Sequence, residues 1–337
     1  MILQKKDFLK VMQLLKPGLA KKDIIEQFTH YLFTGEDIIT FNDEICISHP
    51  FKTDFQCSAR AEELFKTVSG IKEETLEISL EENKMQIRSA GTRAHLTVSS
   101  DKDSEKLISV LDLAGAWSNM KPLPENFARG VYLCMFSASK DMTKGIYTCV
   151  RVGGTDILSS DGIRISRYAL KEDSGLQVLI PARNVEELVK FPVTKCCLTK
   201  SWCHFGTEDG VMFSSRIMEG DYPDLSGYFT IEGQRVRLPA ELRELVASVS
   251  FMTDGKVDKD KTISIKVSKD KITCRGEKKQ IGEIERDLGF EYAQGEFEVQ
   301  MNPVFLYEVL EKATIMKVGK DAAMFLSGSF EHLISLL

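Results

Sequence analysis

The run Pro181-Ala-Arg-Asn-Val-Glu-Glu-Leu-Val-Lys-Phe191 decides the fold, because similar runs occur before and after it. Its counterparts are Ser58-Ala-Arg-Ala-Glu-Glu-Leu-Phe-Lys-Thr-Val68 and Asn302-Pro-Val-Phe-Leu-Tyr-Glu-Val-Leu-Glu-Lys312. The three runs start at residues 58, 181 and 302, so they recur after 123 and 121 residues. Each resembles a helix start, with a proline at the first helical position, an N-cap asparagine or acids in the first turn. This recurrence predicts three similar units along the chain.

A second set of helix starts lies upstream of these runs. Residues 5–15 form an amphipathic stretch, and Leu123-Pro124 and Leu238-Pro239 begin two similar segments. Between the helices, apolar and polar residues alternate with a period of two, which indicates hairpins over 76–89, 157–168 and 263–274. We therefore predict an α+β protein with two helices and antiparallel strands per unit, divided at 1–118, 119–233 and 234–337.

Composition excludes several classes of protein. Of the 337 residues, 43% are hydrophobic, too many for a largely disordered chain. No apolar run approaches the roughly 20 residues that span a bilayer, and the first residues lack the apolar core of a signal peptide, so we expect a cytoplasmic protein. The eight cysteines, with the cluster Cys196-Cys197-x5-Cys203, lack the spacing of a zinc site. They are interpreted as buried, reduced thiols, and we predict no metal and no cofactor.

The charge is polarised along the chain. The net charge is −6, yet residues 5–22 contain six lysines and one acid, a local charge of +5 that leaves −11 for the rest. Further basic residues are predicted on the polar faces of the other helices. A solvated helix surface and a phosphate-attracting surface both remain open as interpretations of this pattern.

Several motifs resemble those of a known family. The run Ser214-Ser-Arg-Ile-Met-Glu-Gly220-Asp-Tyr222-Pro223-Asp224 is similar to the S-x-x-x-x-G-x-[FY]-P-[DN] segment of bacterial sliding clamps, the beta subunits of DNA polymerase III. The run 160–165, Ser-Asp-Gly-Ile-Arg-Ile, resembles the family's [TS]-D-G-x-R-[LI] element, and Ile180-Pro181-Ala-Arg183 follows at a similar spacing. The strand and helix start at Phe297–Asn302 resemble the last half-domain. The likeness extends over essentially the whole chain.

This resemblance implies a ring. Family members have three similar domains, each with two helices inside and antiparallel sheets outside, and two chains close head to tail around duplex DNA. The expected partners are double-stranded DNA bound without sequence specificity, a DNA polymerase, a clamp loader and a second copy of the chain. The residues expected to face DNA are Lys6, Lys10, Lys21, Lys22, Arg60, Lys66, Arg129, Lys140, Arg183, Lys190 and Arg243.

The resemblance also implies a pocket that captures short peptides of partner proteins. The positions that match it are Ser160, Gly162, Arg164, Ile165, Pro223, Asn302, Phe305, Leu333, Ile334 and Leu336. Four departures from the family pattern affect this pocket: Leu225–Phe229 follows Pro-Asp, Ile163 replaces a common histidine, the chain ends Ile-Ser-Leu-Leu, and the last hairpin is short. They suggest a divergent, phage-like member whose partners have co-adapted.

Two alternatives remain beside the clamp. An enzyme would need a constellation that the sequence lacks: it has no Gly-rich phosphate loop, H-E-x-x-H, G-x-S-x-G or paired metal-binding aspartates. We therefore expect an accessory subunit without an active site. The second alternative is a peptide-binding adaptor that has the clamp fold but does not encircle DNA.

Overall fold

The structure is a computed structural model that describes residues 1–21, 25–99, 108–109, 111–255 and 260–337. The chain forms two compact units, Met1–Ala128 with Arg183–Met218 (unit 1) and Arg129–Ala182 with Glu219–Leu337 (unit 2). The predicted middle domain is therefore shared between the two units. The expected domain boundaries remain a prediction.

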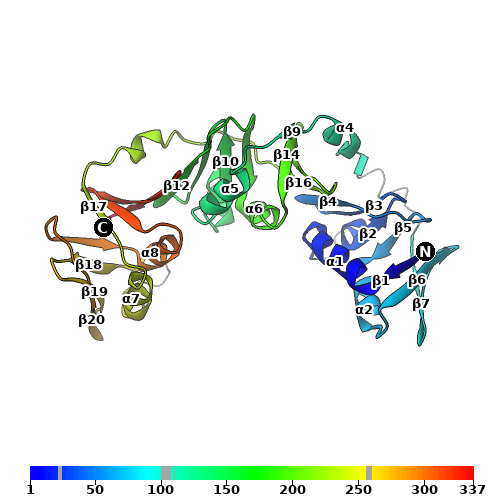
Figure 1. Ribbon diagram of the computed structural model, residues 1–337, viewed down its shortest axis with the longest axis horizontal. Helices are drawn as coiled ribbons and strands as arrows, with labels where there is room; N and C mark the ends of the chain where they lie inside the picture. Colours follow the sequence, from blue (N-terminus) through cyan, green and yellow to red (C-terminus); the bar gives the residue numbers. More distant parts are fainter. Residues whose placement is uncertain (22–24, 100–107, 110, 256–259) are drawn as a thin grey trace. The chain divides into compact units, whose positions relative to one another are not determined.

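Unit 1 contains one four-stranded and one eight-stranded antiparallel sheet (Figure 1). Sheet A has the order β1 (Ile2–Gln4), β6 (Thr75–Glu81), β7 (Lys84–Ser89), β8 (Thr92–Thr97). Sheet B has the order β5 (Cys57–Arg60), β2 (His30–Phe33), β3 (Asp37–Phe41), β4 (Ile45–Pro50), β16 (Met212–Arg216), β15 (Trp202–Thr207), β14 (Val193–Leu198), β9 (Lys121–Pro122).

Unit 2 repeats this arrangement. Sheet C has the order β13 (Gln177–Pro181), β10 (Cys149–Gly153), β11 (Asp156–Ser160), β12 (Arg164–Ala169), β24 (Phe330–Ser335), β23 (Ala322–Ser327), β22 (Ile315–Val318), β17 (Gln234–Arg237). Sheet D has the order β20 (Gly282–Gly289), β19 (Lys271–Lys278), β18 (Ile263–Val267), β21 (Phe297–Met301). The predicted hairpins over 76–89, 157–168 and 263–274 are all present.

The six predicted helices are confirmed. They are α1 (Lys5–Leu15), α2 (Ala61–Gly70), α5 (Phe127–Met135), α6 (Ala182–Leu188), α7 (Leu242–Val249) and α8 (Pro303–Leu310). The described residues also form the short helix α4 (Leu113–Ser118). Their 3-10 turns include η1 (Lys16–Gly18), η2 (Glu26–Thr29), η3 (Met142–Thr148) and η4 (Ser226–Phe229). Helices α1 and α2 pack side by side in unit 1, and α7 and α8 do so in unit 2 (Figure 1).

Helix α1 illustrates how a helix is fixed to its unit. Its apolar stripe of Phe8, Met12 and Leu15 is buried. The last carbonyls of a helix lack intrahelical partners, and here the sheet supplies two donors. The Tyr31 hydroxyl donates to the Met12 carbonyl (2.9 Å) and the Thr40 hydroxyl donates to the Leu15 carbonyl (2.7 Å).

Each eight-stranded sheet is built from two different four-stranded halves joined at one strand pair. One kind of half ends in the strand that leads into the second helix of a repeat: β5 before α2 and β13 before α6. The other kind ends in the short strand before a first helix: β9 before α5 and β17 before α7. The joints are β4–β16 and β12–β24. By the same criterion sheet A is a half of the second kind and sheet D a half of the first kind.

Candidate functional site

The hairpin between β11 and β12 is held by side chains of its own turn. One carboxylate oxygen of Asp161 accepts hydrogen bonds from the backbone N–H groups of Ile163 (3.0 Å) and Arg164 (3.1 Å). The Ser160 hydroxyl donates to the Arg164 carbonyl (2.8 Å). Gly162 has φ +94°, a conformation that residues with a Cβ rarely adopt. The predicted turn is thus a tightly specified structure.

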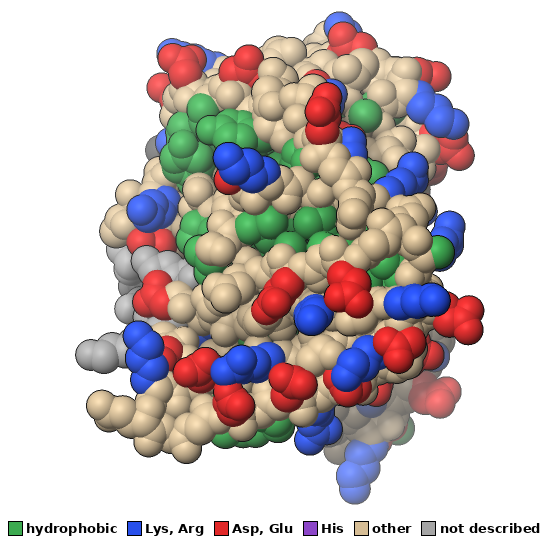
Figure 2. Space-filling model, turned by 90° about the vertical axis from the view of Figure 1, so that its left-hand side faces the viewer, with side chains coloured by type: hydrophobic (Ala, Val, Ile, Leu, Met, Phe, Trp, Pro, Cys, Tyr) green, Lys and Arg blue, Asp and Glu red, His purple; other side chains and the backbone are tan. Residues whose placement is uncertain are grey.

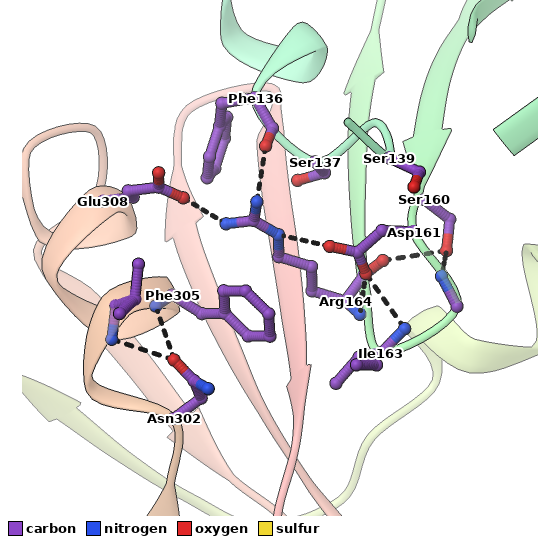
Figure 3. Close-up of polar contacts among 12 residues, drawn as sticks. Phe136, Ser137, Ser139, Ser160, Asp161, Ile163, Arg164, Asn302, Phe305 and Glu308 are labelled. Carbon is purple, nitrogen blue, oxygen red and sulfur yellow. Dashed lines mark hydrogen bonds and ion pairs between the residues drawn. The ribbon is translucent and has the colours of Figure 1, made fainter. Parts of the chain in front are cut away.

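The Arg164 side chain connects this hairpin to two helical segments (Figure 3). Its guanidinium donates to the second carboxylate oxygen of Asp161 (3.0 Å), to the Phe136 carbonyl beyond α5 (2.7 Å), and to Glu308 of α8. Its guanidinium carbon lies 4.2 Å from the centre of the Phe305 ring. Only 4% of Arg164 is exposed. A charge this deeply buried needs all of these partners, so its evident role is structural.

Asn302 and Phe305 belong to the same buried region. The Asn302 side chain caps α8 by accepting from the N–H groups of Val304 (2.9 Å) and Phe305 (3.2 Å), and Pro303 follows at the first helical position. Asn302 is 3% exposed and Phe305 is 6% exposed. Both residues therefore position helix α8 beneath Arg164 rather than forming an open surface.

His332 of β24 is buried on the same face of sheet C as Arg164. The His332 ring lies 2.8 Å from the Ser166 hydroxyl through Nδ1, and it stacks on Phe136 with ring centres 4.9 Å apart. Burial, together with the positive charges of Arg164 and Lys312, lowers the pKa of His332 well below its usual value. His332 is therefore neutral at pH 7, which suits a buried packing group.

The opposite face of sheet C carries an apolar cluster, here called the linker cluster. Its buried members are Ile165 of β12, Leu333 of β24 and Leu225 of the segment between β16 and β17. Ile165 and Leu333 are directly paired across the β12–β24 joint. The partly buried side chains packed against them are Tyr222, Phe229, Ile231 and Ala322. The linker cluster thus presents half-exposed aromatic and aliphatic groups beside the joint.

The residues predicted for a peptide pocket therefore divide between two faces. Successive side chains of a strand point to opposite sides of its sheet, so Ile165 and Leu333 lie in the linker cluster while Arg164 and Ile334 point to the helices. Pro223 is half-buried and follows Tyr222 in the sequence. Leu336 lines a separate groove of about 490 Å³ with Phe297, Val299 and the chain end.

The segment after Asp224 contributes to this site in a way that was not predicted. Leu225, Phe229 and Ile231 all pack in the linker cluster, whereas Leu225–Phe229 was treated only as a departure from the family pattern and Ile231 was not predicted to take part. The available signal was the high apolar content of this connecting segment, which is unusual for an exposed loop.

The basic residues predicted to face DNA fall into two groups. Five have an acidic partner within 4 Å: Arg60 with Glu26, Lys66 with Glu62, Arg183 with Glu44, Lys190 with Glu187 and Arg243 with Glu311. Among the described residues, no ion pair involves the exposed side chains of Lys6, Lys10, Lys21, Arg129 and Lys140. Lys22 lies outside the described residues. Within the described part of the chain, the positive charge of the second group is not offset by an acidic partner.

Their placement also refines the prediction that they occupy helix faces. Lys6 and Lys10 are on α1, opposite its buried stripe, and Arg129 is on α5. Arg60 is the last residue of β5, and Lys140 and Lys190 follow the ends of α5 and α6. The prediction that these basic residues lie on helix faces is therefore wrong for Arg60, Lys140 and Lys190.

Other features of the described residues bear on the expected function. No group of three or more His, Cys, Asp or Glu side chains there could hold a metal ion. Seven of the eight cysteines are buried, and Cys197 is partly exposed. Within the same part of the chain, every helix is too short or too polar to cross a membrane.

The fold is that of the DNA polymerase III beta sliding clamps. The beta subunit of DNA polymerase from Streptococcus pyogenes matches with a TM-score of 0.85 and 17% identity, covering 100% of this chain and 99% of that one. A sliding clamp from Pseudomonas aeruginosa bound to griselimycin gives 0.85 and 14%, covering 100% and 98%. A putative beta subunit from Eubacterium rectale gives 0.82 and 16%, covering 100% and 98%. No protein-family model and no curated protein matches the sequence.

Proposed function

We propose that this chain, which has the sliding clamp fold over its whole length, is a DNA sliding clamp. Two copies would close head to tail into a ring around duplex DNA in the cytoplasm. The ring would act as an accessory subunit without an active site, holding a DNA polymerase on its template and receiving a clamp loader and other partners.

The strand topology is the observation that carries this proposal. Sheets B and C each join one half of each kind, whereas sheet A and sheet D are single halves of complementary kinds. Unpaired edge strands expose backbone N–H and C=O groups, and proteins generally cover or pair them. Sheet A of one copy and sheet D of a second copy can complete each other, and two such contacts close a ring of two chains.

The pattern of charge supports enclosure of DNA. Lys6, Lys10, Lys21, Arg129 and Lys140 attract phosphates without contacting base edges, so binding would be independent of sequence. The excess of acids elsewhere in the chain keeps the net charge at −6 and disfavours nonspecific coating of DNA. Weak phosphate attraction combined with enclosure permits sliding, whereas tight contacts would prevent it.

The linker cluster is the proposed tethering site for partner peptides. Apolar anchors of a short segment would pack on the accessible parts of Tyr222, Phe229 and Ile231, which are partly buried against Ile165, Leu333 and Leu225. Arg164, Asn302 and Phe305 would maintain this site indirectly, by fixing the hairpin and helix α8 beneath it.

The decisive experiment separates enclosure from ordinary binding. The protein is incubated with a nicked circular plasmid near the dimer dissociation concentration, concentrated, and passed over a sizing column before and after the plasmid is linearised. A clamp co-elutes with the circle and is lost from the linear DNA, and its mass is twice 37.9 kDa. A monomer that elutes identically with both DNA forms would refute the proposal and favour the adaptor that does not encircle DNA.

A further inference from the structure

The two joints inside the chain show how its half-sheets pair. In sheet B, Cys46 lies opposite Ser214, and in sheet C, Ile165 lies opposite Leu333. Both joints are antiparallel. The same register predicts how β20, the edge strand of sheet D, would pair with β8, the edge strand of sheet A. The equivalent residues are found by counting from the corresponding hairpin turns.

On the sheet D side, the equivalent position is Glu285. The first hairpins of the three corresponding halves close at Thr34–Asp37, Gly153–Asp156 and Ser268–Lys271. Four residues after each turn lie Phe41, Ser160 and Arg275. The residues paired with these three across the next hairpin are Cys46, Ile165 and Glu285. Glu285 therefore occupies the place that Cys46 and Ile165 occupy at the internal joints.

On the sheet A side, the equivalent position is His95. The corresponding hairpins close at Thr199–Trp202, Gly319–Ala322 and Glu81–Lys84. Two residues after each turn lie His204, Met324 and Gln86. The residues paired with these across the next hairpin are Ser214, Leu333 and His95. His95 therefore occupies the place of Ser214 and Leu333.

We propose that β8 of one copy pairs with β20 of a second copy in this inherited register. His95 then lies opposite Glu285, Arg93 opposite Asp287, and Leu96 opposite Ile284. This assignment rests on the proposed function and adds the residue pairs through which the ring closes.

The side chains fit this register on both faces. Arg93 and His95 are exposed on one face of β8, and Glu285 and Asp287 are exposed on the matching face of β20. Leu96 and Ile284 are half-buried on the other face. A shift by one residue would place these apolar groups opposite charged ones. At the position equivalent to the Arg93–Asp287 pair, sheet C already has an ion pair, Arg167–Glu331 (3.6 Å).

The same charges disfavour pairing between identical edges. Antiparallel pairing of β8 with β8 would bring Arg93 and His95 of two copies together. Pairing of β20 with β20 would gather Glu285 with Glu283 and Asp287, which have Arg275 and Lys271 of β19 as their ion partners. Like charges directly opposite each other destabilise a sheet. Figure 2 shows a face of unit 2 on which acidic and basic side chains alternate in rows. The edges therefore select the head-to-tail contact that closes a two-chain ring.

Cysteine pairing tests the register directly. In the full-length variant H95C/E285C, the two new thiols of neighbouring copies lie opposite each other, so mild oxidation should link most of the protein into covalent dimers. In the control H95C/R286C, the two side chains point to opposite faces, and linkage should be at least tenfold slower. Equal linkage in both variants, or faster linkage in the control, would overturn the register.

Charge reversal tests the selection of partners. The variant R93E places an acid opposite Asp287 at both joints of the ring, and we expect about a 30-fold increase in the dimer dissociation constant. The control K84E makes the same change one strand inside the edge and should alter the constant less than threefold. An unchanged R93E dimer would refute the assigned pairs while leaving the ring intact. A monomeric parent protein would instead refute the proposed function.

Discussion

Replacement of Arg164 by methionine should destabilise unit 2 strongly. The substitution keeps most of the apolar stem but removes the donors to Asp161, Glu308 and the Phe136 carbonyl. The side chains of Asp161 and Glu308 are only 15% and 31% exposed, so both carboxylates lose their cation in a poorly hydrated place. Breaking a buried ion pair costs about 3–5 kcal/mol, and the partial exposure of Glu308 favours the lower end, about 3 kcal/mol.

Thermal unfolding measures this cost. For a unit of this size, each 1 kcal/mol lowers the melting temperature by about 2–4 °C, so R164M should unfold about 6–12 °C below the parent protein. Arg167 provides a matched control, because its ion pairs with Asp156 and Glu331 join side chains that are 29–34% exposed. We expect R167M to lose less than about 1 kcal/mol.

The outcome also distinguishes two roles for Arg164. A residue whose main task is to bind a partner peptide should be replaceable without loss of stability. If R164M melts within 2 °C of the parent protein and loses only peptide binding, the structural role assigned to Arg164 is wrong.

Three further changes test other parts of the structure. The variant K6E/K10E should lose retention on circular DNA. The control K66E changes a lysine that is already paired with Glu62, so it should keep at least half of the retention. Equal losses in both variants would contradict the proposed role of Lys6 and Lys10. N302A removes the cap of α8 and should lower the free energy of unfolding by about 1 kcal/mol in urea, with no change expected if the cap is dispensable. Burial lowers the pKa of His204 to about 4, whereas the unfolded chain has a histidine pKa near 6.5. The contribution of neutral His204 to the free energy of unfolding is therefore complete above pH 6.5 and should be lost as the pH falls towards 4. In H204Q this slope should decrease by up to about 1.4 kcal/mol per pH unit, and an unchanged slope would show that His204 is not responsible.

Local rules made the helices and hairpins predictable from the sequence. Asn302 followed by Pro303 specifies the start of α8 through a side-chain cap and a fixed φ, and the Asp161-Gly162 turn specifies the β11–β12 hairpin. The short helix α4, which ends at the predicted boundary between residues 118 and 119, was not predicted. Asp112 starts it by accepting a hydrogen bond from the Gly115 N–H (3.1 Å), a capping signal that was present in the sequence.

Contacts between distant segments could not be predicted in the same way. The acid that pairs with Arg183 is Glu44, 139 residues away, and periodicity on a helix gives no information about such a partner. The faces occupied by the predicted pocket residues also escaped prediction, since family positions do not reveal that Arg164 is buried beneath the hairpin while Ile165 points the other way. The middle repeat divides between two units because its strands complete two different sheets, β14–β16 in sheet B and β10–β13 in sheet C.

The joint proposed between copies differs from the two internal joints in what covers it. Leu111 belongs to the same apolar cluster as Cys46 beside the sheet B joint, and Leu225 belongs to the linker cluster at the sheet C joint, so a connecting segment of the same chain covers each one. The edges β8 and β20 instead present Arg93, His95, Glu285 and Asp287 on exposed faces. Exposed charge pairs are weak and screened by salt, whereas buried apolar contacts are not. The proposed ring should therefore open between β8 and β20 before either internal joint separates, and added salt should favour that opening.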